Sequence, residues 1–227
     1  MSFVQASLSE MIERADFLYA KRSDIENVRL SVELLTNKET EDYEVAWRLG
    51  RAHFFLGQEA QNRSEARANH AQGIRACERA VALQPDRVEG QFWLGVNLAL
   101  MAGLETLHRA IRHALGAKGA LRRAIQIDPT YHGAGPLRVL GRIQQELPWL
   151  LGGGRNRARA SFEKALHLAP HNTVTRIYFA ELLLEMGDEL EAQKQLDAIL
   201  HAPSDSAWGF EANRDQKLAR EKLAMMG

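Results

Sequence analysis

Cysteine is nearly absent from the chain. Its 227 residues contain one cysteine, Cys77. A single cysteine excludes both an intramolecular disulfide and a zinc site built from cysteines. Because Cys77 occupies the large apolar position of a helical phrase, we expect a buried structural thiol rather than a nucleophile.

The chain also lacks long apolar runs and an excess of either charge. No stretch approaches the roughly 18 apolar residues needed to span a bilayer. Lysine and arginine total 29, as do aspartate and glutamate, so the formal net charge is zero and offers no general attraction to nucleic acid or anionic membrane. The first residues show no basic start followed by an apolar run, so no secretory signal is predicted. We expect a cytoplasmic protein, or a periplasmic one if the true start lies upstream.

Motifs for catalysis and metal binding are missing as well. His108 and His113 are five residues apart, which is the wrong spacing for one helical face, and Pro170 interrupts the pair His167 and His171. No Gly-x-Ser-x-Gly elbow is present. The sequence therefore predicts a protein that is not an enzyme and binds neither metal nor cofactor.

Proline is scarce, yet three of the six prolines end similar phrases. The phrases "CERAVALQPD" (77–86), "LRRAIQIDPT" (121–130) and "FEKALHLAPH" (162–171) each describe one apolar helical face that stops where proline forbids continuation. A second phrase recurs with a large residue before a small one, at Leu49, Leu94, Leu140 and Phe179, in steps of 45, 46 and 39 residues. Such pairs allow helices to approach closely, and the period indicates a helical solenoid.

At these residues the chain resembles tetratricopeptide repeats, whose motif places Leu-Gly in a first helix and Ala and Pro in a second. We therefore predict an all-α fold, a right-handed superhelix of four to five antiparallel helix pairs and a terminal helix, forming one domain over residues 1–227. The expected parts are a divergent N-terminal helix pair at 1–40, repeats at 42–85, 88–129, 134–170 and 173–203, and a C-terminal helix at 206–227.

Two longer segments carry a closer resemblance. "DYEVAWRLGRAHFFLG" (42–57) and the stretch from "YHGAG" to "HNT" (131–173) resemble the T-component proteins of TRAP transporters and, more distantly, the regulator of microtubule dynamics family. The resemblance implies a superhelix with a pocket or pore that serves a periplasmic ligand-binding partner or binds lipid. T-component proteins usually carry an acylated cysteine near the start, whereas the cysteine here is Cys77.

The binding surface is predicted from the first helix of each pair, which lines the concave face of such solenoids. Helical spacing selects eight residues on that face: Trp47, Arg51, Phe54, Phe55, Phe92, Arg138, Arg142 and Gln145. An apolar wall beside paired guanidinium groups suits a peptide carboxylate or the phosphate of an amphipathic lipid. Under the alternative interpretation, the aromatic residues are interhelix core and the arginines form a solvated face.

Extra residues between the paired phrases predict long second helices at 64–83 and 105–127, the latter weakened by Gly116 and Gly119. Longer helices would deepen the walls of the solenoid, so we expect a deep pocket rather than an open groove. Near the N-terminus, Ser23 and Glu26 have the spacing of a capping box.

The segment "ELPWLLGGGRNRA" (146–158) is predicted to be the corner between two helices of one pair. Its three glycines favour left-handed backbone angles, and we expect Trp149, Leu150 and Leu151 to fold back onto the stack. The alternative is an anion-binding nest with Arg155 and Arg157.

Two functions remain open from the sequence. The first is a scaffold that binds a protein or peptide partner. The alternative is a pocket protein for a lipid or small organic anion, serving as an auxiliary of a TRAP-type transporter. Neither involves nucleic acid or a membrane-spanning segment, and the sequence predicts no particular oligomeric state.

Overall fold

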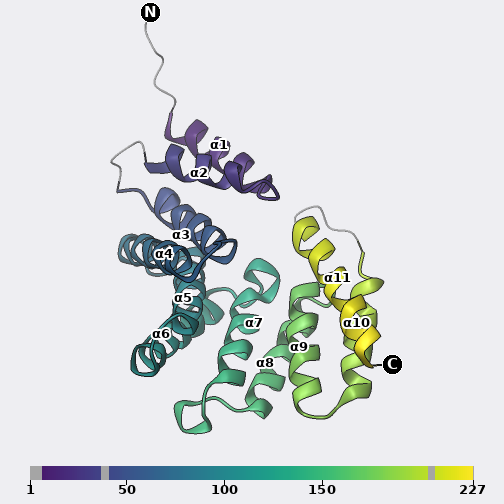
Figure 1. Cartoon of the computed structure of the whole chain (residues 1–227). Helices are drawn as coiled ribbons and strands as arrows, with labels where there is room; N and C mark the ends of the chain where they lie inside the picture. Colours follow the sequence, from purple (N-terminus) through teal and green to yellow (C-terminus); the bar gives the residue numbers. More distant parts are fainter. Residues whose placement is uncertain (1–6, 37–40, 204–207, 227) are drawn as a thin grey trace, which may run out of the picture. The chain divides into compact units, whose positions relative to one another are not determined.

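The computed structural model describes residues 7–36, 41–203 and 208–226. These residues form eleven α-helices, one short 3-10 helix and no strand, which confirms the all-α prediction (Figure 1). The predicted boundaries at residues 40 and 206 lie outside the described residues. The helices are α1 (Leu8–Ala20), α2 (Ile25–Thr36), α3 (Tyr43–Gln58), α4 (Arg63–Leu83), α5 (Val88–Gly103), α6 (Leu107–Ile127), α7 (Tyr131–Glu146), η1 (Trp149–Leu151), α8 (Arg155–Leu168), α9 (Thr173–Glu185), α10 (Glu189–Leu200) and α11 (Gly209–Met226).

Helix packing divides the chain into two compact units, Met1–Ala120 and Leu121–Gly227, with the division inside α6. In the first unit, α1 packs on α2, α2 on α3, and α3 on both α4 and α5. In the second unit, α7 packs on α8 and α8 on α9, while α9 contacts both α10 and α11. Each contact joins an element to its successor or to the first helix of the next pair, as expected for repeated helix pairs.

The long second helices are confirmed. Helices α4 and α6 each contain 21 residues. Gly116 and Gly119 lie within α6 without ending it, because the helix needs no special angles at these positions and loses only the propensity of a larger residue.

The predicted capping box of α2 is wrong. The helix begins at Ile25, and the carboxylate of Asp24 accepts a hydrogen bond from the Glu26 amide at 3.1 Å. Asp24 therefore takes the place expected for Ser23, one residue later in the chain. A capping box does exist at α1, where the Ser7 hydroxyl accepts from the Glu10 amide at 3.2 Å and the Glu10 carboxylate accepts from the Ser7 amide at 2.7 Å.

Glycines in the first helices admit large side chains from their paired helices. A Cβ at Gly50 would overlap the sulfur of Cys77, which is fully buried. A Cβ at Gly141 would lie 2.8 Å from the ring of Phe162, which is also fully buried. Cys77 is thus a buried packing residue as predicted, and burial raises the pKa of its thiol.

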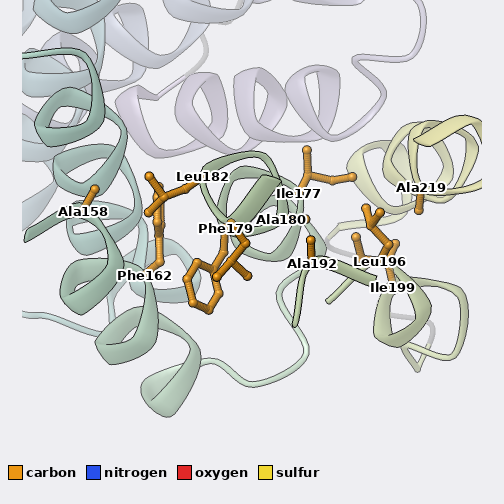
Figure 2. Packing of buried hydrophobic residues seen from close by; sticks show 11 residues of the cluster. Ala158, Phe162, Ile177, Phe179, Ala180, Leu182, Ala192, Leu196, Ile199 and Ala219 are labelled. Atoms are coloured by element: carbon orange, nitrogen blue, oxygen red, sulfur yellow. The ribbon is translucent and has the colours of Figure 1, made fainter. Parts of the chain in front are cut away.

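The core of the second unit joins α8, α9, α10 and α11 (Figure 2). The rings of Phe162 and Phe179 lie with centroids 5.9 Å apart, and Figure 2 places Leu182 beside them. Leu196 and Ile199 of α10 are fully buried on the side where Ala219 of α11 approaches. Burial of each such side chain stabilises the fold by about 1.5–3 kcal/mol, which compensates for the weak propensity of short helices.

Helix α7 opens with an unusual backbone segment. His132, Gly133 and Ala134 have φ values of 53°, 60° and 56°, three consecutive left-handed residues of which two are not glycine. Pro136 follows in the first regular turn, where its missing N–H costs no helical hydrogen bond. A left-handed run of this kind is strained, so surrounding contacts must hold it.

Candidate functional site

The eight predicted site residues fall in both units. Trp47, Arg51, Phe54, Phe55 and Phe92 belong to the first unit, and the other three belong to the second. Each group is described within its own unit.

Asp16 of α1 is the centre of a charged cluster in the first unit. Its carboxylate accepts from Arg48 at 3.0 Å and 2.8 Å, and from Arg51 at 2.6 Å. Burial would raise the pKa of Asp16, but the hydrogen bonds from Arg48 and the charge of Arg51 outweigh it, so the pKa is lowered. The ionised carboxylate ties α1 to α3 and occupies one of the predicted ligand-binding arginines.

Arg51 has further contacts within the unit. Its guanidinium lies 4.0 Å from the centroid of the Tyr19 ring and 5.0 Å from that of Trp47. Its Nε is buried and has no hydrogen-bond partner among the described residues. Trp47 is 8% exposed, and its indole N–H donates to Glu44 at 2.8 Å. These contacts match the alternative interpretation, in which Trp47 belongs to the core.

The phenylalanines of the predicted ligand wall are largely internal. Phe92 is 1% and Phe55 is 4% exposed. The centroid of the Phe92 ring lies 4.8 Å from that of Trp93, and the centroid of the partly buried Phe54 ring lies 5.2 Å from that of Trp93. Of this group, Phe54 and Arg51 keep partial exposure, and contact with a ligand stays a prediction for all five residues.

A second polar cluster in the first unit was not predicted from the sequence. The Tyr43 hydroxyl donates to Glu89 at 2.9 Å and accepts from the Gly90 amide at 3.2 Å. Arg87 pairs with Glu89 at 2.8 Å and with Glu44 at 3.2 Å. Except for Arg87 and Glu89, which are two residues apart, the partners are more than 40 residues apart, so no local spacing reveals the cluster.

Between α3, α4 and α5 lies a buried polar group. The Asn97 amide donates to the Gly50 carbonyl at 3.0 Å and to the Trp93 carbonyl at 2.9 Å. Its oxygen lies 3.2 Å from His70 Nδ1, which therefore carries the proton. Burial lowers the pKa of His70 and outweighs the hydrogen bond to Asn97, so the imidazole is neutral. The polar groups of Asn97 thus have hydrogen-bond partners within the protein, and these bonds join α3, α4 and α5.

In the second unit, Arg138 holds the left-handed segment of α7. The residue is 4% exposed, and its guanidinium donates to the Gly133 carbonyl at 3.1 Å and to the Asn172 side chain at 3.3 Å. The ring of Trp208 lies 5.6 Å away. Burial lowers the pKa of Arg138 to about 10, which leaves it charged at neutral pH. The sequence predicted a ligand-binding arginine, and the structure gives it a clamping role that spacing could not indicate.

Arg142 and Gln145 instead lie on a partly exposed polar surface, the α7–α9–α11 face. The face is formed by six residues: Arg142, Gln145, Tyr178, Glu181, Glu185 and Lys222. Arg142 and Lys222 pair with the two oxygens of the Glu181 carboxylate, at 3.2 Å and 3.1 Å. The Arg142 side chain is 39% exposed and that of Lys222 is 27% exposed. One carboxylate thus serves two accessible cations.

The corner between α7 and α8 differs from the prediction. Gly152 and Gly154 have positive φ values of 76° and 112°, which agree with the predicted left-handed backbone. Trp149 and Leu150, however, are 71% and 74% exposed, so the expectation that they fold back is wrong. The 3-10 turn directs both side chains outward, and only Leu151 is partly buried.

The anion nest proposed for this corner is also contradicted. The amides of Gly152, Gly153 and Gly154 donate to backbone carbonyls at 2.9, 3.0 and 2.7 Å. Because each amide already has an acceptor, the glycines offer an anion no unpaired donor.

Over residues 7–36, 41–203 and 208–226, no three His, Cys, Asp or Glu side chains are grouped to hold a metal ion. Over the same ranges, no helix has the length and apolar character needed to cross a membrane.

Comparison with known families gives two matches. The sequence model of regulator of microtubule dynamics protein 1-3 matches residues 11–142, more than half of the chain. A tetratricopeptide repeat model matches residues 155–212. No curated protein matches the sequence.

Solved structures support the same fold. A thermophilic TPR protein of Thermus thermophilus is 22% identical, with a TM-score of 0.69, covering 92% of this chain and 99% of that one. Two MamA structures give TM-scores of 0.52 and 0.51, with 18% and 16% identity. They cover 86% and 88% of this chain, and 90% and 95% of their own. At these identities the likeness shows the tetratricopeptide fold alone.

Proposed function

The chain belongs to the regulator of microtubule dynamics protein 1-3 family, and from that premise we propose that it is a non-enzymatic scaffold for protein or peptide partners. Support comes from the tetratricopeptide-like helix pairs, an architecture consistent with protein–protein interaction. Stacked helix pairs present extended surfaces that are not assembled around reacting groups.

The observation that carries the proposal is the shared carboxylate of the α7–α9–α11 face. Arg142 and Lys222 share the Glu181 carboxylate, while the other carboxylate of the face, Glu185, accepts a hydrogen bond from the neutral Gln145 side chain. Exposed ion pairs contribute only about 0–1 kcal/mol, so a partner carboxylate can replace Glu181 at little cost. A guanidinium also binds a carboxylate through two parallel hydrogen bonds, which suits a peptide side chain or C-terminus.

We propose that Arg142 and Gln145 contact the partner directly. In this proposal Arg138 acts indirectly, because it supports the start of α7 from a buried position. In the first unit, Phe54 and Arg51 are the predicted residues with side chains left partly open. The buried aromatic residues would contribute through the shape of the helices.

Selection of peptides from a random display library on the purified chain tests this function. We expect the selected peptides to carry a carboxylate, and Arg142→Gln to weaken their binding about tenfold or more in calorimetry. The matched control is Arg159→Gln on α8, an arginine of similar exposure that pairs with Glu163 and Asp188. Equal affinity of both variants and the original chain would count against the proposal.

The alternative is the pocket protein for a lipid or small organic anion, with or without a TRAP-type transporter. The burial of the Arg138 charge favours it, because a buried cation is suited to a bound anion. Native mass spectrometry of gently purified protein distinguishes the two functions. A lipid adduct that is lost in Arg142→Gln favours the pocket, whereas a bare mass favours the scaffold. The compartment, cytoplasmic or periplasmic, stays a prediction.

A further inference from the structure

The Trp149 corner, residues 147–157, joins the end of α7 to the first turn of α8 and presents apolar side chains that no helix of the described residues covers. Trp149 and Leu150 are among the most exposed large hydrophobic residues of the described chain. The other tryptophans are at least partly buried, and Trp47 and Trp93 are 8% and 1% exposed. Exposure of an indole beside a leucine is unfavourable in water and suggests a surface that is covered in use.

The backbone of this corner is held in place while its apolar side chains project. The Arg157 guanidinium donates to the carbonyls of Trp149 and Gly153, at 3.2 Å each. The Gly154 amide closes the corner by donating to the Gln144 carbonyl at 2.7 Å. A Cβ at Gly153 would overlap the Leu147 carbonyl, so this close approach requires glycine. The display of Trp149 and Leu150 is therefore built into the turn.

Charge next to the projecting side chains is mainly positive. Arg155 and Arg157 open α8 and are both exposed. The nearby acidic residue is Glu146, at the end of α7. The indole and the leucine at the tip suit the interfacial region of a bilayer, and the two guanidinium groups behind them suit its anionic headgroups.

The size of the apolar tip decides between a bilayer and a protein. Trp149 and Leu150 together offer on the order of 300 Å². A stable protein interface needs about 800 Å² from each partner, so this tip is too small to hold one. Shallow insertion into lipid needs only a small apolar element with a basic patch, and tryptophan favours the interfacial region.

We propose that the Trp149 corner docks on the surface of an anionic lipid bilayer. Trp149 and Leu150 insert at the level of the headgroups, and Arg155 and Arg157 lie against lipid phosphates. Docking is weak and reversible, because one apolar element and two cations form the whole contact. The proposal is independent of partner binding on the α7–α9–α11 face.

The neighbouring corner of the same unit supplies an internal control. Leu190, at the start of α10, is 69% exposed, comparable to Leu150. It is flanked by the carboxylates of Asp188, Glu189 and Glu191, which an anionic surface repels. Apolar exposure alone therefore predicts binding through both corners, whereas the proposal predicts binding only through Trp149 and Leu150.

Cosedimentation of the full chain with vesicles tests the proposal. One set contains phosphatidylcholine alone and the other phosphatidylcholine mixed with phosphatidylglycerol. We expect binding to the mixed vesicles and a blue shift of tryptophan emission. Trp149→Ser and Leu150→Ser should each weaken binding about tenfold, and Arg155→Gln about fivefold, while Leu190→Ser leaves it unchanged.

Three outcomes would overturn the proposal. They are failure of the chain to bind mixed vesicles, an equal loss of binding in Leu190→Ser, and full binding by Trp149→Ser. A fourth outcome would also overturn it: concentration-dependent self-association without vesicles that Trp149→Ser abolishes would assign the corner to contact between two copies. All four substitutions are at exposed side chains, and circular dichroism spectra that match the unsubstituted chain establish that each variant is folded.

Discussion

The contact between Gly50 and Cys77 sets the spacing of α3 and α4 at a single pair of residues. Gly50→Ala places a methyl group on the Cys77 sulfur, and we expect the free energy of unfolding to fall by about 1–3 kcal/mol. Cys77→Ala removes that sulfur, so Gly50→Ala should lower the free energy of unfolding by a smaller amount in the Cys77→Ala variant than in the original chain. A double-mutant cycle measured by urea unfolding gives this coupling.

Gly119→Ala is the matched control for the Gly50 experiment. Apart from the neighbouring backbone of α6 itself, no atom of the described residues lies within 4 Å of a Cβ at Gly119, and alanine there gains helix propensity of up to about 1 kcal/mol. If the losses of unfolding free energy in Gly50→Ala and Cys77→Ala were additive, Gly50 would not be needed to make room for the Cys77 thiol.

The buried imidazole of His70 makes stability depend on pH. Its folded-state pKa lies below the ordinary value of 6.5, so the unfolded chain binds a proton more readily. The stabilisation is complete above pH 6.5 and decreases as pH falls toward the lowered folded-state pKa. We expect His70→Gln to show a smaller loss of urea midpoint than the original chain between neutral pH and pH 5.

A second histidine contributes to the pH measurement. His53 also has a pKa lowered by burial, so a reduced loss should remain in His70→Gln. An unchanged profile in His70→Gln would mean that folding does not lower the pKa of His70.

At the level of elements, the left-handed start of α7 depends on Arg138. Arg138→Met removes the donors to Gly133 and Asn172, and we expect a loss of about 2 kcal/mol in unfolding free energy. Arg142→Gln, at a half-exposed ion pair, should cost less than about 1 kcal/mol. If Arg138 served a ligand alone, its substitution would leave the stability of the ligand-free chain unchanged.

The helices themselves were predictable because their signals are local. The helix pairs and the lengths of α4 and α6 were predicted from the Leu-Gly phrases and from the prolines at 85, 129 and 170. The cap of α2 was misplaced by one residue, since Ser23 and Asp24 are both good caps and only packing selects between them.

The candidate site was less predictable for a similar reason. Helical spacing placed Arg138 and Arg142 on one face, four residues apart, yet one is buried and the other half-exposed. That difference comes from Gly133 in the left-handed start of α7, and from Asn172 and Trp208, which approach Arg138 from distant parts of the chain. The exposure of Trp149 is likewise set by positive φ angles at glycines, and hydrophobicity alone predicted the opposite.

At the level of the whole molecule, the family matches describe helix packing and leave one internal segment uncovered. The matches span residues 11–142 and 155–212, so the glycine-rich part of the Trp149 corner lies between them. Repeat motifs consist of residues that pack helices together. A segment whose side chains point to solvent is therefore free to differ, and it is the place where this chain can acquire a contact of its own.

The burial of Cys77 also makes its thiol a probe of local opening in the first unit. It is the only thiol in the chain, and it lies fully buried against α3. A thiol reagent can reach its sulfur only during the brief periods when α3 and α4 separate. When closing is faster than labelling, the labelling rate of the intact protein divided by that of the unfolded chain gives the fraction of time for which the first unit is open at Cys77.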